Sequence, residues 1–225
     1  MCGRFTLTVD FAKLKEAFKD FKFPNKFAPR FNIAPTQPVL AIPNDGKKKA
    51  DFFVWGLIPS WTKDPAIGNR LINARGETLA EKPAFRGGYK YKRCLILANG
   101  FYEWKSQPGT KTKTPYFIHL KSGDMFAFAG LWDELNSSDG STIRSCTIVT
   151  TMPNELMSAI HNRMPVILQP SDYAEWLDTS PRASESLAHL IRPLTTELMN
   201  AYPVSTLVNS PANDRAECIM PYKEN

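Results

Sequence analysis

The chain has 225 residues, of which 43% are hydrophobic and 22% are charged, as in a globular protein of one large or two small domains. No apolar run is long enough to span a bilayer, and the first residues lack the layout of a signal peptide. We therefore expect no membrane partner, and a protein located in the cytoplasm of a bacterium or in the nucleus of a larger cell. Lys and Arg exceed Asp and Glu by 28 to 22, which favours a polyanionic partner, although a generally basic surface would give the same +6 charge.

Short apolar stretches, rich in β-branched and aromatic residues and separated by Gly, Pro, Asn and Asp, indicate many strands joined by turns. In chain order these stretches are residues 39–42, 52–58, 94–98, 116–120, 125–131, 147–150 and 166–168.

Helix signals are fewer. Asp10 predicts the N-cap of a first helix whose apolar residues at 11, 14, 17 and 18 share one face. Asp172 and Glu175 have the spacing of a capping box at the start of a second, short helix. A third helix is expected over residues 184–191, ending before Pro193.

Because the strands do not alternate with long helices, a doubly wound parallel sheet is not expected. The pattern favours an α+β fold with a strongly curved, mainly antiparallel sheet, like an open barrel, and flanking helices. We find no internal repeat and no linker, so residues 1–225 are expected to form one domain, with the last ten or so as a loose tail.

The four cysteines are scattered and form no C-x-x-C pair, so neither a zinc site nor a disulfide framework is indicated, and no cofactor is expected. Cys2 differs from the others by its place at the chain end. If Met1 is removed, Cys2 carries a free α-amine and a thiol on adjacent carbons, and together they can close a five-membered thiazolidine ring on an aldehyde. Both groups have a pKa close to neutral, about 7.8 for the amine and about 8.5 for the thiol. The alternative is an ordinary second residue.

Three further side chains suit chemistry at a site. Asn73 offers an amide that can hold a reacting oxygen, or it can cap a turn. Glu103, between Tyr102 and Trp104, is a candidate proton donor with a raised pKa, or a satisfied carboxylate at a strand end. His161 lies at an expected turn before a strand, where imidazole can act as an acid or base or can serve the structure.

Two residues have the properties of nucleic-acid contacts. Arg75 follows the same apolar pair as Asn73 and is a candidate phosphate ligand, or a turn residue. Trp61 lies in a loop beside Lys63, a pairing used to stack a base next to a phosphate, although a partly buried loop tryptophan is the plainer interpretation.

Taken in order, seven segments of the chain resemble the SOS-response-associated peptidase (SRAP) family, the abasic-site-processing proteins. They cover residues 1–5, 30–35, 55–59 with Trp61, 72–75, 100–104, 148–151 and 160–165. Any one of them is weak evidence, but seven in the same order extend over most of the chain.

The resemblance implies a basic cleft for single-stranded DNA containing abasic sites, in a monomeric protein. It implies that Cys2, freed of Met1 by the protein's own peptidase activity or by an aminopeptidase, forms a thiazolidine crosslink with the ring-opened sugar. It links Asn73 and His161 to recognition of that sugar, and Glu103 to proton transfer. Arg4, Arg75 and Arg163 become candidate phosphate contacts.

The chain departs from the family pattern at two positions. Asn162 follows the histidine and Asn99 precedes the Gly-Phe-Tyr-Glu-Trp run, where many members carry Asp. Two other functions stay open. A cysteine peptidase acting on other proteins would use Cys2 with His161, and a non-covalent single-strand binder would use Trp61 and the arginines.

Overall fold

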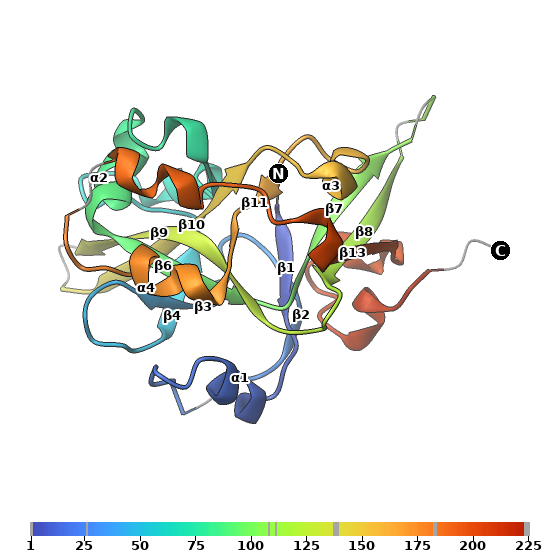
Figure 1. Cartoon of the computed structure of the whole chain (residues 1–225), viewed down its shortest axis with the longest axis horizontal. Helices are drawn as coiled ribbons and strands as arrows, with labels where there is room; N and C mark the ends of the chain where they lie inside the picture. The colour runs from blue at the N-terminus through green and yellow to red at the C-terminus, as the bar shows by residue number, and fades with distance from the viewer. Residues whose placement is uncertain are drawn as a thin grey trace.

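The computed structural model describes residues 2–25, 27–107, 109–110, 112–136, 140–181 and 184–222. Met1, on whose removal the expected Cys2 chemistry depends, lies outside the described residues. The last three residues, which belong to the expected loose tail, lie outside them as well. Within these ranges the fold is α+β, with two sheets and a few short helices (Figure 1). In this part of the chain no helix is long and apolar enough to cross a membrane.

The larger sheet closes on itself. Its ring consists of β3 (Pro38–Pro43), β4 (Asp51–Trp55), β6 (Arg93–Ala98), β9 (Phe126–Asn136) and β10 (Thr142–Thr151). Strands β9 and β10 pair antiparallel and complete the barrel, in which only the β10–β4 pairing is parallel. The expected curved, mainly antiparallel sheet is confirmed, and it closes further than the open barrel predicted from the sequence.

Three short strands extend this barrel. Strand β5 (Asn73–Arg75) pairs with β10 in parallel, β11 (Met164–Pro165) pairs with the end of β10, and β12 (Ile167–Leu168) pairs with β9. Strand β4 ends at Trp55, short of the predicted residue 58, because Gly56 takes φ +132° where its backbone lies against Gly68. A Cβ at position 56 would lie 2.5 Å from the Gly68 carbonyl oxygen, so only glycine fits.

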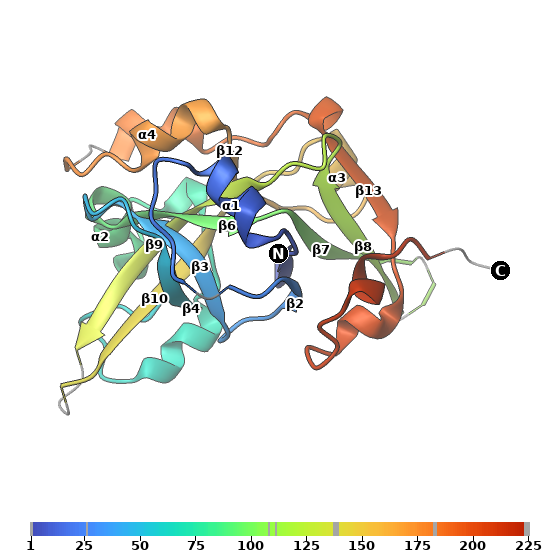
Figure 2. The same ribbon diagram turned by 90° about the horizontal axis from the view of Figure 1, so that it is seen from below.

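The second sheet has the order β13–β8–β7–β1–β2, and Figures 1 and 2 show it beside the barrel. Its strands are β1 (Arg4–Leu7), β2 (Arg30–Ile33), β7 (Gly100–Ser106), β8 (Lys113–Leu120) and β13 (Met199–Pro203). The aromatic rings of Phe5 and Phe101 pack against Phe128 of the barrel and join the two sheets in one core.

Helices are short and peripheral: α1 (Phe11–Ala17), α2 (Pro83–Tyr91), α3 (Glu155–Ser158) and α4 (Tyr173–Trp176). The predicted cap of α1 is confirmed, since the Asp10 side chain accepts a hydrogen bond from the Lys13 backbone N–H. The predicted capping box at Asp172 is wrong: this carboxylate makes no cap bond and pairs instead with Arg192 at 3.2 Å. The third predicted helix forms as a 3-10 helix, Ser184–Leu190.

The C-terminal part of the chain folds back onto β1 and β2. Part of the segment expected to be a loose tail is ordered, because Ala216–Ile219 forms a 3-10 turn and Cys218 is fully buried. Asn32, also fully buried, donates from its amide nitrogen to the carbonyl oxygens of Val208, Ser210 and Asn213.

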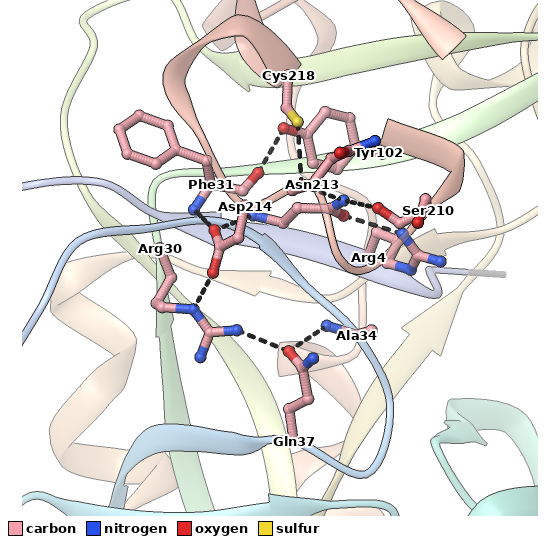
Figure 3. A network of polar contacts seen from close by, with 11 residues as sticks. Arg4, Arg30, Phe31, Ala34, Gln37, Tyr102, Ser210, Asn213, Asp214 and Cys218 are labelled. Carbon is pink, nitrogen blue, oxygen red and sulfur yellow. Dashed lines mark hydrogen bonds and ion pairs between the residues drawn. The ribbon is translucent and has the colours of Figure 1, made fainter. Parts of the chain in front are cut away.

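Asp214 completes this C-terminal network, which we define as Arg4, Arg30, Asn32, Asp214 and the backbone of residues 208–213 (Figure 3). The Asp214 carboxylate accepts from the backbone N–H groups of Phe31 and Asn32 and pairs with Arg30. The segment is thereby fixed to the second sheet by buried polar contacts.

Candidate active site

Cys2 lies at the start of β1, inside the core. Its side chain is fully buried, and its carbonyl oxygen accepts a hydrogen bond from Asn73 Nδ2 at 2.8 Å. Asn73 reaches Cys2 because β5 pairs in parallel with β10, which places Asn73 opposite Ile148. Burial, and next the negative charge of Glu103, raise the pKa of the Cys2 thiol. In this chain the thiol is therefore protonated at neutral pH, and Glu103 is close enough to influence it.

Glu103 lies in the interior of β7 rather than at the expected strand end. Strand β1 pairs antiparallel with β7, with Arg4 opposite Tyr102, and this register brings the residues before Arg4 beside Glu103. The carboxyl group is 2% exposed, and this burial raises its pKa above the usual range. A carboxyl whose pKa is raised holds its proton more tightly than an ordinary glutamic acid, which suits a group that gives and takes protons.

The aromatic neighbours of Glu103 do not cause this burial, contrary to the sequence interpretation. Side chains alternate between the two faces of a strand, and Tyr102 and Trp104 belong to the small cluster under the C-terminal segment. Tyr102 donates to the Phe31 carbonyl oxygen, and Trp104 Nε1 donates to Asn209 Oδ1. Phe101, on the same face as Glu103, packs in the main core.

His161 lies in the turn between α3 and β11, as predicted. His161 Nδ1 lies 3.0 Å from the Arg163 backbone nitrogen and 3.3 Å from the Arg163 carbonyl oxygen, so this ring nitrogen is held within the turn in either tautomer. Burial, assisted by the positive charges of Lys113 and Arg163, lowers the pKa of His161. The ring is therefore neutral at physiological pH.

Arg163 holds this turn in place. Its guanidinium binds both carboxylate oxygens of Glu77, at 2.7 and 2.9 Å, and the Thr150 carbonyl oxygen at 2.8 Å. The residue is only 9% exposed, so its donors are directed into the protein. The contact joins the His161 turn to Glu77, which follows β5. Strand β5 itself carries Asn73 and Arg75. Glu77 lies two residues after the segment 72–75, but nothing local in the sequence identifies a partner 86 positions away.

Lys113, at the start of β8, is a second residue that sequence reasoning did not select. Its positive charge lowers the pKa of Glu103 and that of His161, so these two groups share one electrostatic environment. We refer to Cys2, Asn73, Glu103 and His161 as the Cys2 cluster.

The candidate phosphate contacts differ in exposure. Arg75 is exposed, and its guanidinium makes no hydrogen bond or ion pair with the rest of the described chain. Arg4 is half-buried and donates to Asn32 Oδ1 and to the carbonyl oxygens of Val208 and Asn209, within the network of Figure 3. Arg4 and Arg163 thus serve internal contacts, whereas Arg75 faces solvent.

The structure also places the loop tryptophan and the two asparagines that depart from the family pattern. Trp61 is 62% exposed and lines a hollow beside α2, which the members of the Cys2 cluster do not line. Asn99 joins the far end of β1 to β7, since its Oδ1 accepts from the Thr8 backbone N–H and from Thr6 Oγ1. Asn162 is exposed. Arg163 is therefore held by Glu77, without an acidic residue at position 162.

The Cys2 cluster combines groups for carbonyl chemistry. It has a thiol, a buried carboxyl with a raised pKa and a neutral imidazole N–H. Asn73 adds a buried Oδ1 that accepts no hydrogen bond from the described residues. Such an acceptor can hold an amine or a hydroxyl group of a ligand.

Comparisons with known proteins show the family to which the chain belongs. A model of the family described as SOS response associated peptidase (SRAP) matches residues 1–211. The abasic site processing protein YoqW of Bacillus subtilis is 48% identical over 222 residues, covering 97% of this chain and 99% of the relative. The abasic site processing protein HMCES of Rattus norvegicus is 32% identical, covering 88% of this chain and 66% of the relative. A crystal structure of a Bacteroides thetaiotaomicron protein is similar with a TM-score of 0.88 at 25% identity, covering 99% of this chain and all of that one.

Proposed function

Because the chain belongs to the SOS response associated peptidase family, we propose that it processes abasic sites in single-stranded DNA through a covalent bond to Cys2. Removal of Met1, by the protein itself or by an aminopeptidase, gives Cys2 a free α-amine. The protein then acts as a monomer that shields the abasic site from nucleases and from strand cleavage, in the bacterial cytoplasm.

The covalent step has a simple balance. The Cys2 amine adds to the aldehyde carbon of the ring-opened sugar, and the resulting carbinolamine loses its hydroxyl as water to give an imine. The thiol then adds to the imine carbon, its proton moves to the nitrogen, and a thiazolidine closes. One C–N and one C–S bond form, one water is released, and no oxidant is required.

The single observation that carries this proposal is the position of Cys2 between Asn73 and Glu103. The Asn73 amide fixes the Cys2 carbonyl group and with it the adjacent amine. Glu103, with its raised pKa, is suited to protonate the departing hydroxyl, to recover a proton from the nitrogen as the imine forms, and then to relay the thiol proton to that nitrogen. The neutral imidazole of His161 is suited to form a hydrogen bond with a sugar oxygen.

A peptidase acting on other proteins fits the geometry less well. A Cys–His peptidase needs a thiolate next to an imidazolium, whereas burial and Glu103 raise the Cys2 thiol pKa and burial lowers the pKa of His161. Both shifts favour the neutral forms. Non-covalent strand binding through Arg75 and Trp61 is compatible with our proposal as the step before the crosslink.

The test is denaturing electrophoresis with single-stranded DNA that contains one abasic site. We expect a heat-stable shifted band for protein that intact mass shows to lack Met1. A matched protein with an uncleavable residue before Cys2 keeps the thiol but has an amide nitrogen, so it should give no stable band. Equal crosslinking by the two proteins would contradict the thiazolidine step.

A further inference from the structure

A hollow of about 170 Å³ lies between α2 and the turn that follows β4. Two aromatic side chains line it, Trp61 from the turn and Tyr91 from the end of α2, and they are 62% and 51% exposed. Gly87 and Gly88 of α2 line it as well. Exposed aromatic rings beside two glycines, which have no side chains, are well suited to bind a flat, apolar group.

Packing explains only one of the two glycines. A Cβ at Gly88 would lie 3.3 Å from the Leu131 Cβ, so the barrel wall requires a small residue there. A Cβ at Gly87 would meet nothing within 4 Å. Glycine in a helix interior is unfavourable relative to alanine, and Gly87 has no steric reason to be present. Its absent side chain keeps the lining of the hollow open.

The two sides of the hollow are fixed to each other through one carboxylate. Asp133 Oδ2 accepts from the Ser60 backbone N–H at 2.8 Å, next to Trp61 in the turn. Asp133 Oδ1 pairs with Lys92 Nζ at 2.6 Å, next to Tyr91 at the end of α2. Because β9 supplies Asp133, the spacing of the two aromatic residues is set by the barrel, and little ordering is needed when a ligand enters.

The helix that forms one side of the hollow, with the residue before it, carries exposed basic side chains. Lys82, Arg86 and Lys90 are exposed along α2, and none of them has an ion-pair partner in the described ranges. Lys90 Nζ lies 5.1 Å from the centre of the Tyr91 ring, so a cation accompanies one of the two aromatic residues. Cations that no carboxylate neutralises, next to stacking surfaces, complement a strand of bases and phosphates.

We infer that this hollow binds one nucleobase of the single strand, outside the abasic nucleotide, between Trp61 and Tyr91, with neighbouring phosphates on Arg86 and Lys90. The inference rests on the proposed function, since it takes DNA as the ligand. Figures 1 and 2 both place α2 to the side of the barrel, away from the start of β1. The hollow therefore belongs to the flanking strand and not to the nucleotide that reacts with Cys2.

The test separates this contact from the covalent step. A fluorescein-labelled 20-nucleotide oligothymidine without an abasic site is titrated by anisotropy against wild type, Gly87→Leu, Tyr91→Ala and Tyr91→Phe. Gly87→Leu fills the hollow and Tyr91→Ala removes one ring, so each should bind about 5-fold or more weakly, the loss of one stacked base. Tyr91→Phe keeps the ring and should bind like wild type. Arg86→Glu should weaken binding more than the matched control Lys121→Glu, which changes an exposed lysine on a turn after β8.

Strand length provides the second measurement. The loss in Gly87→Leu should disappear as the oligonucleotide is shortened toward three nucleotides, because a short strand does not reach the hollow. Thermal melting confirms that the variants fold. Gly87→Ala, whose Cβ would meet nothing within 4 Å, should bind the 20-mer with an affinity between those of wild type and Gly87→Leu. Wild-type affinity of folded Gly87→Leu and Tyr91→Ala for the 20-mer would overturn the inference. Weaker binding by both variants, with no crosslink to abasic DNA by wild type, would support the hollow and contradict the Cys2 chemistry.

Discussion

The polar groups on the two sides of strand β7 differ in their hydrogen bonding. On one side, Glu103 is buried in the Cys2 cluster with a raised pKa, and Asn73 Oδ1 accepts no bond from the described chain. On the other side lies the C-terminal network, in which Asn32 uses its amide nitrogen three times and Asp214 binds two backbone N–H groups and Arg30.

This difference separates chemistry from stability. A buried polar group with its bonds satisfied contributes rigidity, whereas one that lacks a partner costs free energy of folding. The Cys2 cluster carries this cost in folding free energy, next to strand β7, whose opposite face is held by the C-terminal network. Changes in the Cys2 cluster should therefore alter reaction rates more than stability, and changes in the C-terminal network should do the reverse.

The largest expected effect compares one substitution on the two sides. Cys2→Ser keeps the amine but replaces the thiol with a far poorer nucleophile, so stable crosslinks should fall below detection, leaving an imine that borohydride traps. Cys218→Ser, in the C-terminal segment, should crosslink like wild type and lose about 1 kcal/mol of stability, because a hydroxyl is costlier to bury. The measurements are denaturing gels and urea melts. Stable crosslinking by Cys2→Ser would remove Cys2 from its role.

Glu103→Gln tests the buried carboxyl. Glutamine keeps the shape but cannot transfer a proton, so crosslink formation and reversal should slow by about 100-fold, with non-covalent affinity unchanged. Single-turnover gels on abasic DNA give the rates. Rates equal to those of wild type in both directions would assign Glu103 a structural role.

The same substitution has a pH-dependent effect on stability. Burial raises the folded-state pKa of Glu103 above its ordinary 4.5. The stability that this carboxyl contributes to the folded state is therefore complete below pH 4.5, and it is lost as the pH rises through the raised pKa. Glutamine does not ionise, so the Tm of Glu103→Gln minus that of wild type should increase from pH 4 toward neutrality. A constant difference over this range would contradict the raised pKa.

The C-terminal network should show the opposite behaviour. Asp214→Ala leaves the Phe31 and Asn32 N–H groups and the Arg30 guanidinium without their acceptor, and should cost about 2–3 kcal/mol of stability. Asp214→Asn, which keeps one acceptor oxygen, should cost less. Urea unfolding measures both. A stability loss below that of Cys218→Ser would mean that the network contributes little.

The sequence predicted the barrel better than the second sheet. Barrel strands such as β6 and β9 are nearly continuous apolar runs, because both of their faces are buried. Strands β1, β2 and β7 carry Arg4, Asn32 and Glu103, and these polar residues interrupt the apolar pattern. Arg4 and Asn32 find partners in the far C-terminal segment, so no local signal identified their strands.

The candidate site was predictable as a set of residues and not as a geometry. The resemblance selected Cys2, Asn73, Glu103 and His161, but the cause of Glu103 burial was assigned to the wrong neighbours, because alternation along β7 was not recognised. The Glu77–Arg163 pair could not be predicted either. It joins two segments that come together because β5 and β11 both pair with the end of β10.

The smallest expected effect compares two arginines that the resemblance treated alike. Arg75 is exposed, so Arg75→Gln should leave the melting temperature unchanged and weaken single-strand binding, with the log–log salt slope reduced by about 0.7 for one lost phosphate contact. Arg4 bonds Asn32 Oδ1 and two carbonyl groups, so Arg4→Gln should cost about 1–3 kcal/mol of stability in addition to any loss of affinity. Anisotropy titrations at several salt concentrations, together with urea melts, measure both quantities for each variant. If Arg75→Gln destabilised the fold while Arg4→Gln changed only the salt slope, the assignment of Arg4 to the network and of Arg75 to the DNA surface would be reversed.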